Sequence, residues 1–335
     1  MTNRVTIKEI AKELGVSVAS VSRALNGKGE ISAELKKKIL EKAKELGYVA
    51  NYNAISLRNK TTNLIGVLVP DTFNPFFAHF VTKTEEYLYD LGYEILLSTT
   101  RESLEKERDY LEIMLSKNVS GILSSPASRS SNYSVYKRLS DMGVPIVFFD
   151  RSIRDLNLCQ VTTDNRNAVY SAVKTLCENG HKKIAFIESV PETTIGAERL
   201  QGYREAMEGL YNNDRIEDLE SFLENDLETE VYRILNQKPT ALITGNLVIT
   251  KYLLRILKSL RINIPDDLSL IAFDDSEWLE INVPPITAIR QPIDRMAECS
   301  VELLIDRIKN EKKEPQQIEL KNELILRDSV TNIGH

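Results

Sequence analysis

Two short helical patterns meet at a glycine near the start of the chain. Gly15 ends the first pattern, and Ser17 stands where a serine side chain caps the helix that follows. Apolar residues at helical spacing form one inward face across both patterns: Ile7, Ile10, Ala11, Leu14, Val16, Val21, Ala24 and Leu25. A third amphipathic pattern begins after Ser32. This arrangement is typical of a helix-turn-helix DNA-binding module.

The outer face of the second helix carries small or polar side chains and one guanidinium group. Arg23 can bond a guanine edge at two points, and Val18 and Ala19 can contact thymine methyl groups. The serines of this face are suited to phosphate contacts, which set the register on the duplex. The residues of the head that we expect to contact DNA are Thr6, Ser17, Val18, Ala19, Ser20, Ser22, Arg23 and Asn26.

The charge of the chain is unevenly distributed, and this separates a DNA-binding head from an ordinary helical subdomain. Residues 1–60 contain 12 Lys or Arg and 6 Asp or Glu, a net charge of +6. The whole chain carries −6, so residues 61–335 carry −12. A basic head on an acidic body is expected of a phosphate-binding module joined to a sensor domain.

From residue 64 onward, short apolar runs alternate with amphipathic helical patterns. The expected strands are 64–69, 93–99, 119–124, 145–150, 183–188, 240–244 and 268–273. The expected helices are 75–91, 104–117, 131–142, 165–179, 196–211, 228–236 and 247–260. This alternation predicts doubly wound parallel sheets, and its restart near residue 165 predicts two similar α/β lobes.

The motifs of the common α/β enzymes are missing from the sequence. No GxGxxG, GxxxxGK[ST] or GxSxG is present, so the chain lacks the nucleotide cradles and the nucleophile elbow. The 3 cysteines and 3 histidines have no metal-ligand spacing. No apolar run has the length of a membrane span, and the N-terminus has no apolar signal segment. We therefore expect a cytoplasmic protein that is not an enzyme and has no cofactor or metal.

Six segments, in one order and spacing, resemble a single known family. They are TIKEIAKELGVSVASVSRALNG, LGYVANYNAISLRNKTTNLIGVLVPDTFNPFFA, NGHKKIAFI, ERLQGY, IPDDLSLIAFDD and PPITAIRQP. Together they resemble the lactose-repressor/galactose-repressor (LacI/GalR) family of bacterial transcription regulators over nearly the whole chain. The resemblance implies a DNA-binding domain at 1–52, a hinge helix and linker at 53–61, and an effector-binding and dimerisation core at 62–330.

The implied core is similar to periplasmic sugar-binding proteins, whose chain crosses between two lobes three times. The implied N-terminal lobe is about 62–160 plus 292–319, and the implied C-terminal lobe is about 161–291 plus 320–330. The positions that match effector contacts of the family are Phe73, Phe76, Phe77, Asp150, Arg199, Asn246 and Asp274. Trp278 lies just beyond, where stacking on a sugar is one interpretation. Carboxylate, amide and guanidinium groups suit a polyol ligand, although Leu247 replaces an Asp that is common in the family.

The hinge segment 53–59 is too short to be a stable helix on its own. In the family that it resembles, this segment becomes helical when two subunits meet on the operator, and a leucine wedges into the minor groove. Leu57 matches that leucine, and Asn53 and Leu57 are the hinge residues that we expect to contact DNA. Ala50 stands where a proline is common, and Ile55 stands where a basic residue is common.

These expectations combine into one function. The sequence predicts a repressor of carbohydrate uptake or catabolism genes that binds a palindromic DNA operator as a homodimer. A small effector, which could be a sugar, a sugar acid or a sugar phosphate, would control it. Two alternatives remain: a family regulator controlled by a phosphorylated carrier protein, and a sugar-binding module with no role at DNA.

Overall fold

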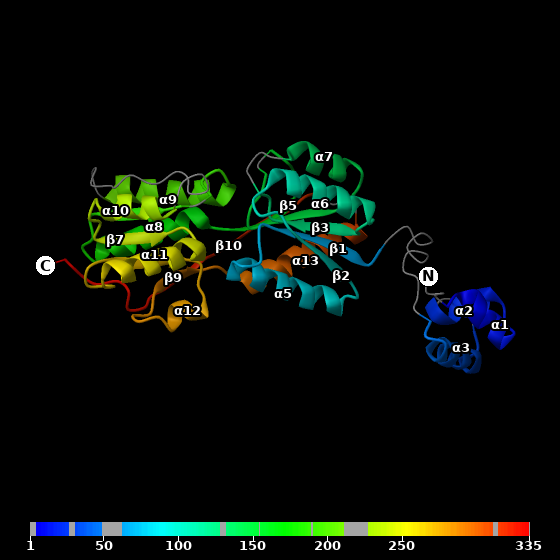
Figure 1. Ribbon diagram of the computed structural model, residues 1–335. Coiled ribbons are helices and arrows are strands. Elements are labelled where there is room, and N and C mark those ends of the chain that lie inside the picture. The colour runs from blue at the N-terminus through cyan, green and yellow to red at the C-terminus, as the bar shows by residue number, and fades with distance from the viewer. Residues whose placement is uncertain are drawn as a thin grey trace. The chain divides into compact units, whose positions relative to one another are not determined.

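The computed structural model describes residues 5–26, 31–48, 62–127, 132–153, 155–188, 190–210, 227–310 and 314–334. The chain divides into two compact units, Met1–Thr61 and Thr62–His335. The first unit is the helical head, and the second is an α/β core with two sheets (Figure 1). Asn53 and Leu57 lie outside the described residues.

The head contains the helices α1 (Ile7–Leu14), α2 (Val18–Asn26) and α3 (Ala33–Glu45). Gly15 ends α1 with φ 61°, in the left-handed region that glycine adopts without strain. The Ser17 hydroxyl accepts a hydrogen bond from the Ser20 amide at 3.1 Å, as expected of a helix cap. All the expected inward residues belong to one hydrophobic cluster, in which Ile10, Val21 and Ile39 are fully buried. The helix-turn-helix prediction is therefore confirmed.

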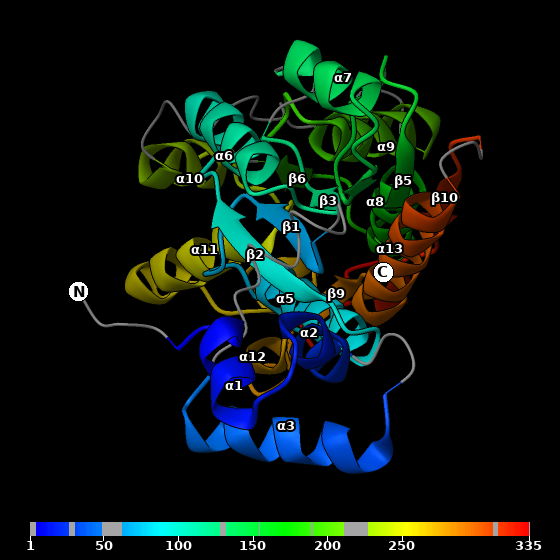
Figure 2. The same cartoon turned by 90° about the vertical axis from the view of Figure 1, so that its right-hand side faces the viewer.

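The first lobe of the core is a parallel sheet with the strand order β10-β5-β4-β3-β1-β2. Its strands are β1 (Leu64–Val69), β2 (Glu94–Thr99), β3 (Gly121–Ser124), β4 (Ile146–Phe149), β5 (Cys159–Thr163) and β10 (Gln317–Leu320). Its helices are α5 (Pro75–Asp90), α6 (Leu104–Ser116), α7 (Tyr133–Asp141) and α13 (Ile293–Lys309). The helices α5 and α13 cover one face, and α6 and α7 cover the other (Figure 2).

The second lobe has the strand order β11-β9-β8-β7-β6, in which β11 alone is antiparallel. Its strands are β6 (Ile184–Ile187), β7 (Ala241–Thr244), β8 (Ser269–Phe273), β9 (Thr287–Arg290) and β11 (Glu323–Ile325). Its helices are α8 (Asn165–Glu178), α9 (Thr194–Leu210), α10 (Leu227–Leu235), α11 (Leu247–Leu260) and α12 (Glu277–Glu280). Two lobes whose strands are all parallel apart from β11 confirm the predicted fold class.

The chain crosses between the lobes after β5, after β9 and after β10. The expected first boundary near residue 160 is a few residues early, because β5 pairs with β4 and β10 and stays in the first sheet through Thr163. The second crossing lies between Arg290 and Ile293. The strands β5, β9, β10 and β11 were not among the expected strands. The crossings bring the carboxyl ends of both sheets to the same region of the core.

Candidate functional site

The outer face of α2 presents the side chains expected at DNA. Val18, Ala19 and Arg23 are exposed, and Ser20 and Ser22 are half-buried. The Ser17 and Ser20 hydroxyls lie 2.9 Å apart. Ser17 is exposed, so the residue that caps α2 also faces solvent. At the start of α1, Thr6 is exposed and its amide donates to Glu9 at 2.6 Å. Asn26 is the last residue of α2.

A second candidate site is the interlobe cluster, which consists of Asp150, Arg199, Asp274 and Gln291. Asp150 directly follows β4 of the first lobe, and Asp274 directly follows β8 of the second lobe. Both are non-glycine residues in the left-handed region, with φ 60° and 71°, and both are buried. Such conformations are strained and persist mainly where the surrounding structure holds a functional group in place.

Arg199, on α9, is the cation of the interlobe cluster. Its Nε donates to Asn165 Oδ1 at 2.9 Å, and its Nη1 donates to the Gly245 carbonyl at 2.6 Å. The guanidinium carbon lies 3.6 Å from the centre of the Phe273 ring. These contacts fix the guanidinium in a buried position, from which its charge acts on both Asp150 and Asp274.

Gln291 connects the two lobes through hydrogen bonds. Its Nε2 donates to Asp274 Oδ1 at 2.7 Å. Its Oε1 accepts a bond of 2.9 Å from the hydroxyl of Thr163, the last residue of β5 in the first lobe. Sequence analysis did not single out Thr163, Asn165 or Gln291. The segment PPITAIRQP contains Gln291, but only the folded chain shows which carboxylate its amide meets.

Burial dominates the electrostatics of the two carboxyl groups. It raises the pKa of Asp150 to about 6, although Arg151 and Arg199 oppose the shift, and Asp274 adds to it. Burial also raises the pKa of Asp274, against the opposing effects of Arg199 and Gln291. Two buried carboxyl groups with raised pKa values favour a ligand that supplies hydrogen-bond donors to them.

The aromatic and amide side chains expected at the effector lie in several environments. Phe76 and Phe77 are buried in the first-lobe hydrophobic core, with ring centroids 5.0 Å apart, and Phe73 is 92% exposed. Trp278 packs against the hydrophobic core of the second lobe. Asn246 accepts a hydrogen bond from the Ile249 amide at 3.0 Å and caps α11. Asn246 follows Gly245, whose carbonyl binds Arg199.

A pocket of about 480 Å³ opens against Asp274 and Gln291. Its other lining residues come from α5, α12, the end of β9, the start of α13 and the segments before α12 and α13: His79, Asp275, Ser276, Glu277, Glu280, Arg290, Pro292, Ile293, Asp294 and Arg295. Asp150 and Arg199 do not line this pocket. The pocket therefore adjoins the interlobe cluster through Asp274 and Gln291, and the volume suits a small molecule.

Neither a metal centre nor a membrane span is found in the part of the chain that the structure describes. Across that part, no group of three or more His, Cys, Asp or Glu side chains could hold a metal ion. No described helix is both long enough and apolar enough to cross a bilayer.

Comparisons with known proteins identify the family. A family model described as bacterial regulatory proteins, lacI family, matches residues 6–51, and models of periplasmic binding protein domains match residues 65–249 and 173–330. The repressor PurR of Photobacterium profundum is 32% identical over 98% of this chain and 99% of its own length. The chain belongs to the lacI family of bacterial regulatory proteins.

Two further relatives agree with this family assignment. The ribose operon repressor of Halalkalibacterium halodurans is 30% identical over 97% of this chain and 96% of its own length. The solved structure of the transcriptional regulator CelR in complex with cellobiose is 27% identical, covers 97% of this chain and 100% of its own, and gives a TM-score of 0.71. This LacI-family chain is a DNA-binding transcriptional repressor and not an enzyme, as the sequence predicted.

The buried carboxyl group of Asp150 gives a prediction about stability. Its pKa is higher in the folded chain than in the unfolded chain, so its contribution to stability is full below pH 4 and is lost as the pH rises through about 6. Asp150→Asn removes the charge and keeps a residue that tolerates positive φ. We expect this variant to be more stable than the wild type above pH 6, by up to about 3 kcal/mol, with a smaller gain near pH 4.

Urea unfolding of the core at pH 4.5 and pH 8, followed by circular dichroism, measures this difference. Asp90→Asn at the exposed end of α5 is the matched control, for which we expect no such pH dependence. Equal stability of Asp150→Asn and the wild type at pH 8 would show that Asp150 is not a destabilising buried charge.

Proposed function

We propose that this repressor binds a palindromic operator as a homodimer in the cytoplasm and controls genes of carbohydrate uptake or catabolism. A sugar-like effector at the interlobe cluster would regulate it. The observation that carries this proposal is a buried set of charged and amide side chains from both lobes, in a chain that also has a basic helix-turn-helix head. The names of two relatives, a ribose operon repressor and a regulator in complex with cellobiose, support a sugar as effector.

The effector would act through the relation between the lobes. Asp150 lies in the first lobe, and Arg199 and Asp274 lie in the second, so a ligand that binds all three favours one lobe orientation over another. A ligand shifts an equilibrium only through such differential affinity. The coupling to DNA would be typical of allosteric proteins, about 1–3 kcal/mol. By reciprocity, the operator changes effector affinity by the same factor.

Arg23 is the proposed base-reading residue. Because its exposed guanidinium can bond a guanine edge at two points, Arg23→Ala should weaken operator binding by about 1–3 kcal/mol and relax specificity at one base position in each half-site. Mobility shifts on the operator and on single-base variants measure both effects. Lys36→Ala, which removes an exposed cation from α3, is the control. An equal loss of affinity for every sequence would show that Arg23 contacts phosphate and does not read a base.

The effector site is tested by a ligand screen followed by operator titration. Thermal shift with sugars, sugar acids and sugar phosphates identifies compounds that stabilise the folded chain. We expect Asp274→Ala and Arg199→Ala to bind operator but to lose the response to the compound that acts on the wild type. Asp266→Ala, at an exposed position of the same lobe, should respond normally. A normal response of both site variants would show that the effector binds elsewhere. A response to a phosphorylated carrier protein alone would favour a family regulator that such a protein controls.

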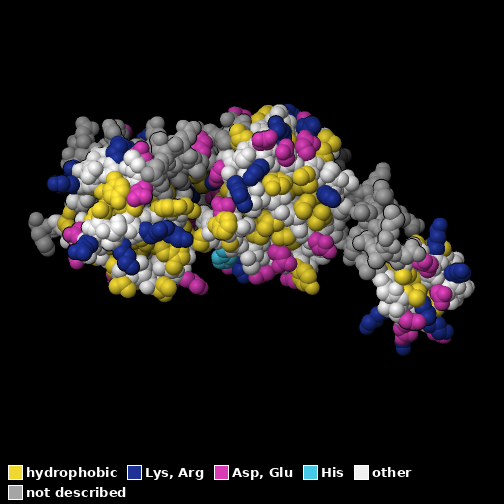
Figure 3. Space-filling model, in the orientation of Figure 1, with side chains coloured by type: hydrophobic (Ala, Val, Ile, Leu, Met, Phe, Trp, Pro, Cys, Tyr) yellow, Lys and Arg dark blue, Asp and Glu magenta, His cyan; other side chains and the backbone are white. Residues whose placement is uncertain are grey.

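The proposed dimer is supported by apolar side chains that the second lobe exposes. Val248 and Tyr252, one helical turn apart on α11, are 44% and 46% exposed, and Ile281 and Val283 after α12 are 78% and 93% exposed. Hydrophobic side chains lie at the surface over these elements (Figure 3). A second copy of the chain would cover them, and palindromic DNA has the matching two-fold symmetry.

Tyr252→Asp combined with Val283→Asp should therefore convert the dimer into monomers, because each change places a charge in an apolar interface. Analytical ultracentrifugation at micromolar concentration measures the assembly state, with Met142→Asp at an exposed apolar position after α7 as the control. We expect the monomer to lose most of its operator affinity. A wild-type chain that sediments as a monomer or a tetramer would contradict the proposal.

A further inference from the structure

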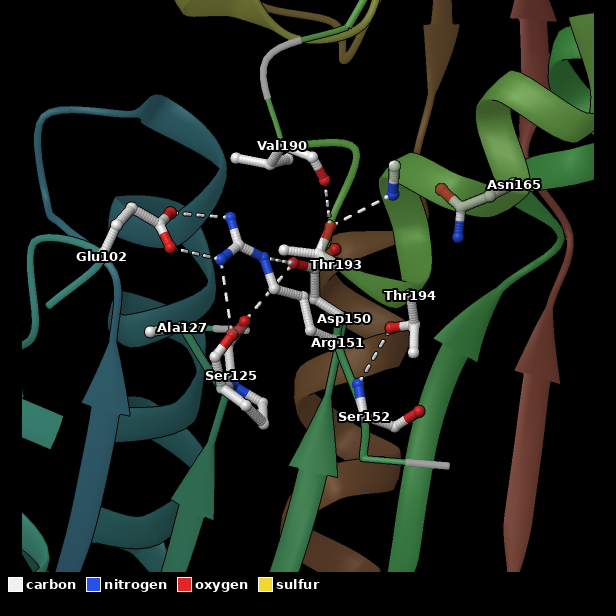
Figure 4. Close-up of polar contacts among 12 residues, drawn as sticks. Glu102, Ser125, Ala127, Asp150, Arg151, Ser152, Asn165, Val190, Thr193 and Thr194 are labelled. Carbon is white, nitrogen blue, oxygen red and sulfur yellow. Dashed lines mark hydrogen bonds and ion pairs between the residues drawn. The ribbon is translucent and has the colours of Figure 1, made fainter. Parts of the chain in front are cut away.

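A second buried guanidinium lies next to the interlobe cluster and is held by a carboxylate. Arg151 follows Asp150 at the end of β4, and its side chain is 6% exposed. Its Nη1 and Nη2 donate to the two carboxylate oxygens of Glu102 at 2.7 and 2.9 Å. Nη1 also donates to the Pro126 carbonyl at 3.3 Å. Arg151 lies between Glu102 and Asp150 (Figure 4), with Nε 3.8 Å from an Asp150 oxygen.

The backbone conformation around Glu102 indicates that the Glu102–Arg151 ion pair has a function. Arg101 and Glu102 are consecutive non-glycine residues with φ 51° and 58°, in the short connection between β2 and α6. The Arg101 amide donates to the Pro70 carbonyl at 2.7 Å, which fixes this connection to the end of β1. Two consecutive left-handed residues are strained. The strained turn directs the Glu102 carboxylate onto Arg151.

As a result, protein acceptors hold the terminal nitrogens of Arg151 and two nitrogens of Arg199, while Arg151 Nε, 3.8 Å from Asp150, has no hydrogen-bond partner among the described residues. The carboxylates of the cluster keep acceptor capacity. Arg199 binds Asn165 and the Gly245 carbonyl, and Arg151 binds Glu102. In contrast, Asp150 accepts a long bond of 3.4 Å from the Ser125 hydroxyl, and Asp274 accepts from Gln291. Each carboxylate group can accept several more hydrogen bonds.

We propose that Glu102 sets the charge class of the effector: by occupying Arg151, it reserves the interlobe cluster for uncharged, hydroxyl-rich ligands and excludes sugar phosphates and sugar acids. This inference rests on the proposed function, because it assigns a ligand class to the same site. Hydroxyl groups of a neutral polyol donate to Asp150 and Asp274. An anionic ligand would meet both carboxylates, while the guanidinium nearest Asp150 is already paired with the Glu102 carboxylate. An unpaired buried charge is strongly unfavourable.

The test removes the Glu102 charge and measures whether an anion site is created. Inorganic phosphate is the probe, potassium chloride at matched ionic strength is the reference, and the melting temperature of the full-length protein is the readout. All variants carry Asp150→Asn, which removes the carboxylate nearest Arg151. In this background we compare four proteins: one with Glu102 intact, one with Glu102→Gln, one with Glu102→Gln and Arg151→Gln, and one with Glu105→Gln. Glu105→Gln is the control, because Glu105 is exposed in the first turn of α6.

With Glu102 intact, we expect phosphate to raise the melting temperature no more than chloride does. Glu102→Gln should produce a saturable, phosphate-specific rise, and adding Arg151→Gln should abolish it. The Glu105→Gln control should behave like the background. Phosphate bound elsewhere on the chain shifts all four proteins equally, so it does not affect the comparison.

Two results would overturn the inference. One is a folded Glu102→Gln variant, verified by circular dichroism, that gains no phosphate response. The other is a phosphate response of the Asp150→Asn background, with Glu102 intact, that the addition of Arg151→Gln alone removes, because Arg151 would then already be an anion site. If Glu102→Gln does not fold, the comparison of the background protein with its Arg151→Gln variant decides alone. Equal phosphate responses of these two proteins support the inference. Operator binding of the same proteins, measured by mobility shift, tests the proposed function separately.

Discussion

The buried charges of Asp150, Arg199 and Asp274 are the constraint on which the rest of the core depends. Each would be unfavourable alone in a low-dielectric interior, and their balance requires both lobes, because Asp150 comes from the first and the other two come from the second. The contact between the Ser152 amide and the Thr194 hydroxyl, 3.1 Å long, joins the same two lobes beside them. The charge balance of the site therefore depends on how the two lobes are placed relative to each other.

The site is held in place by stability that the sheets supply. Asp150, Asp274 and Glu102 all have positive φ, and burial raises the pKa of both aspartates, so this region destabilises the fold. The strands β3, β4, β6, β7 and β8 are fully buried and mostly apolar, and helices pack on both faces of each sheet. A strained polar site at the carboxyl ends of rigid strands is the arrangement expected of a ligand-binding α/β protein.

The sequence predicted those parts of the molecule that depend on local patterns. Long apolar runs predicted β1 and β8, and spacing and capping residues predicted α1 and α2, because periodicity and caps act within a few residues. The edge strand β10 was missed, since Gln317–Leu320 is only four residues long, contains two polar residues and has a partner on one side only. Glu102 and Gln291 were missed because their roles depend on side chains that are far away in the sequence.

The position of Gln291 connects the fold to the proposed regulation. Thr163 and Gln291 lie at the first and second crossings between the lobes, and their hydrogen bond leads directly to Asp274. A rotation of one lobe against the other acts first on residues at the crossings, since the chain leaves one sheet and enters the other lobe there. A ligand that competes with Gln291 for Asp274 therefore changes the same hydrogen bonds that fix the crossing. Coupling of this kind needs no contact between the ligand and the DNA-binding head, because ligand binding and DNA binding would both depend on the lobe orientation.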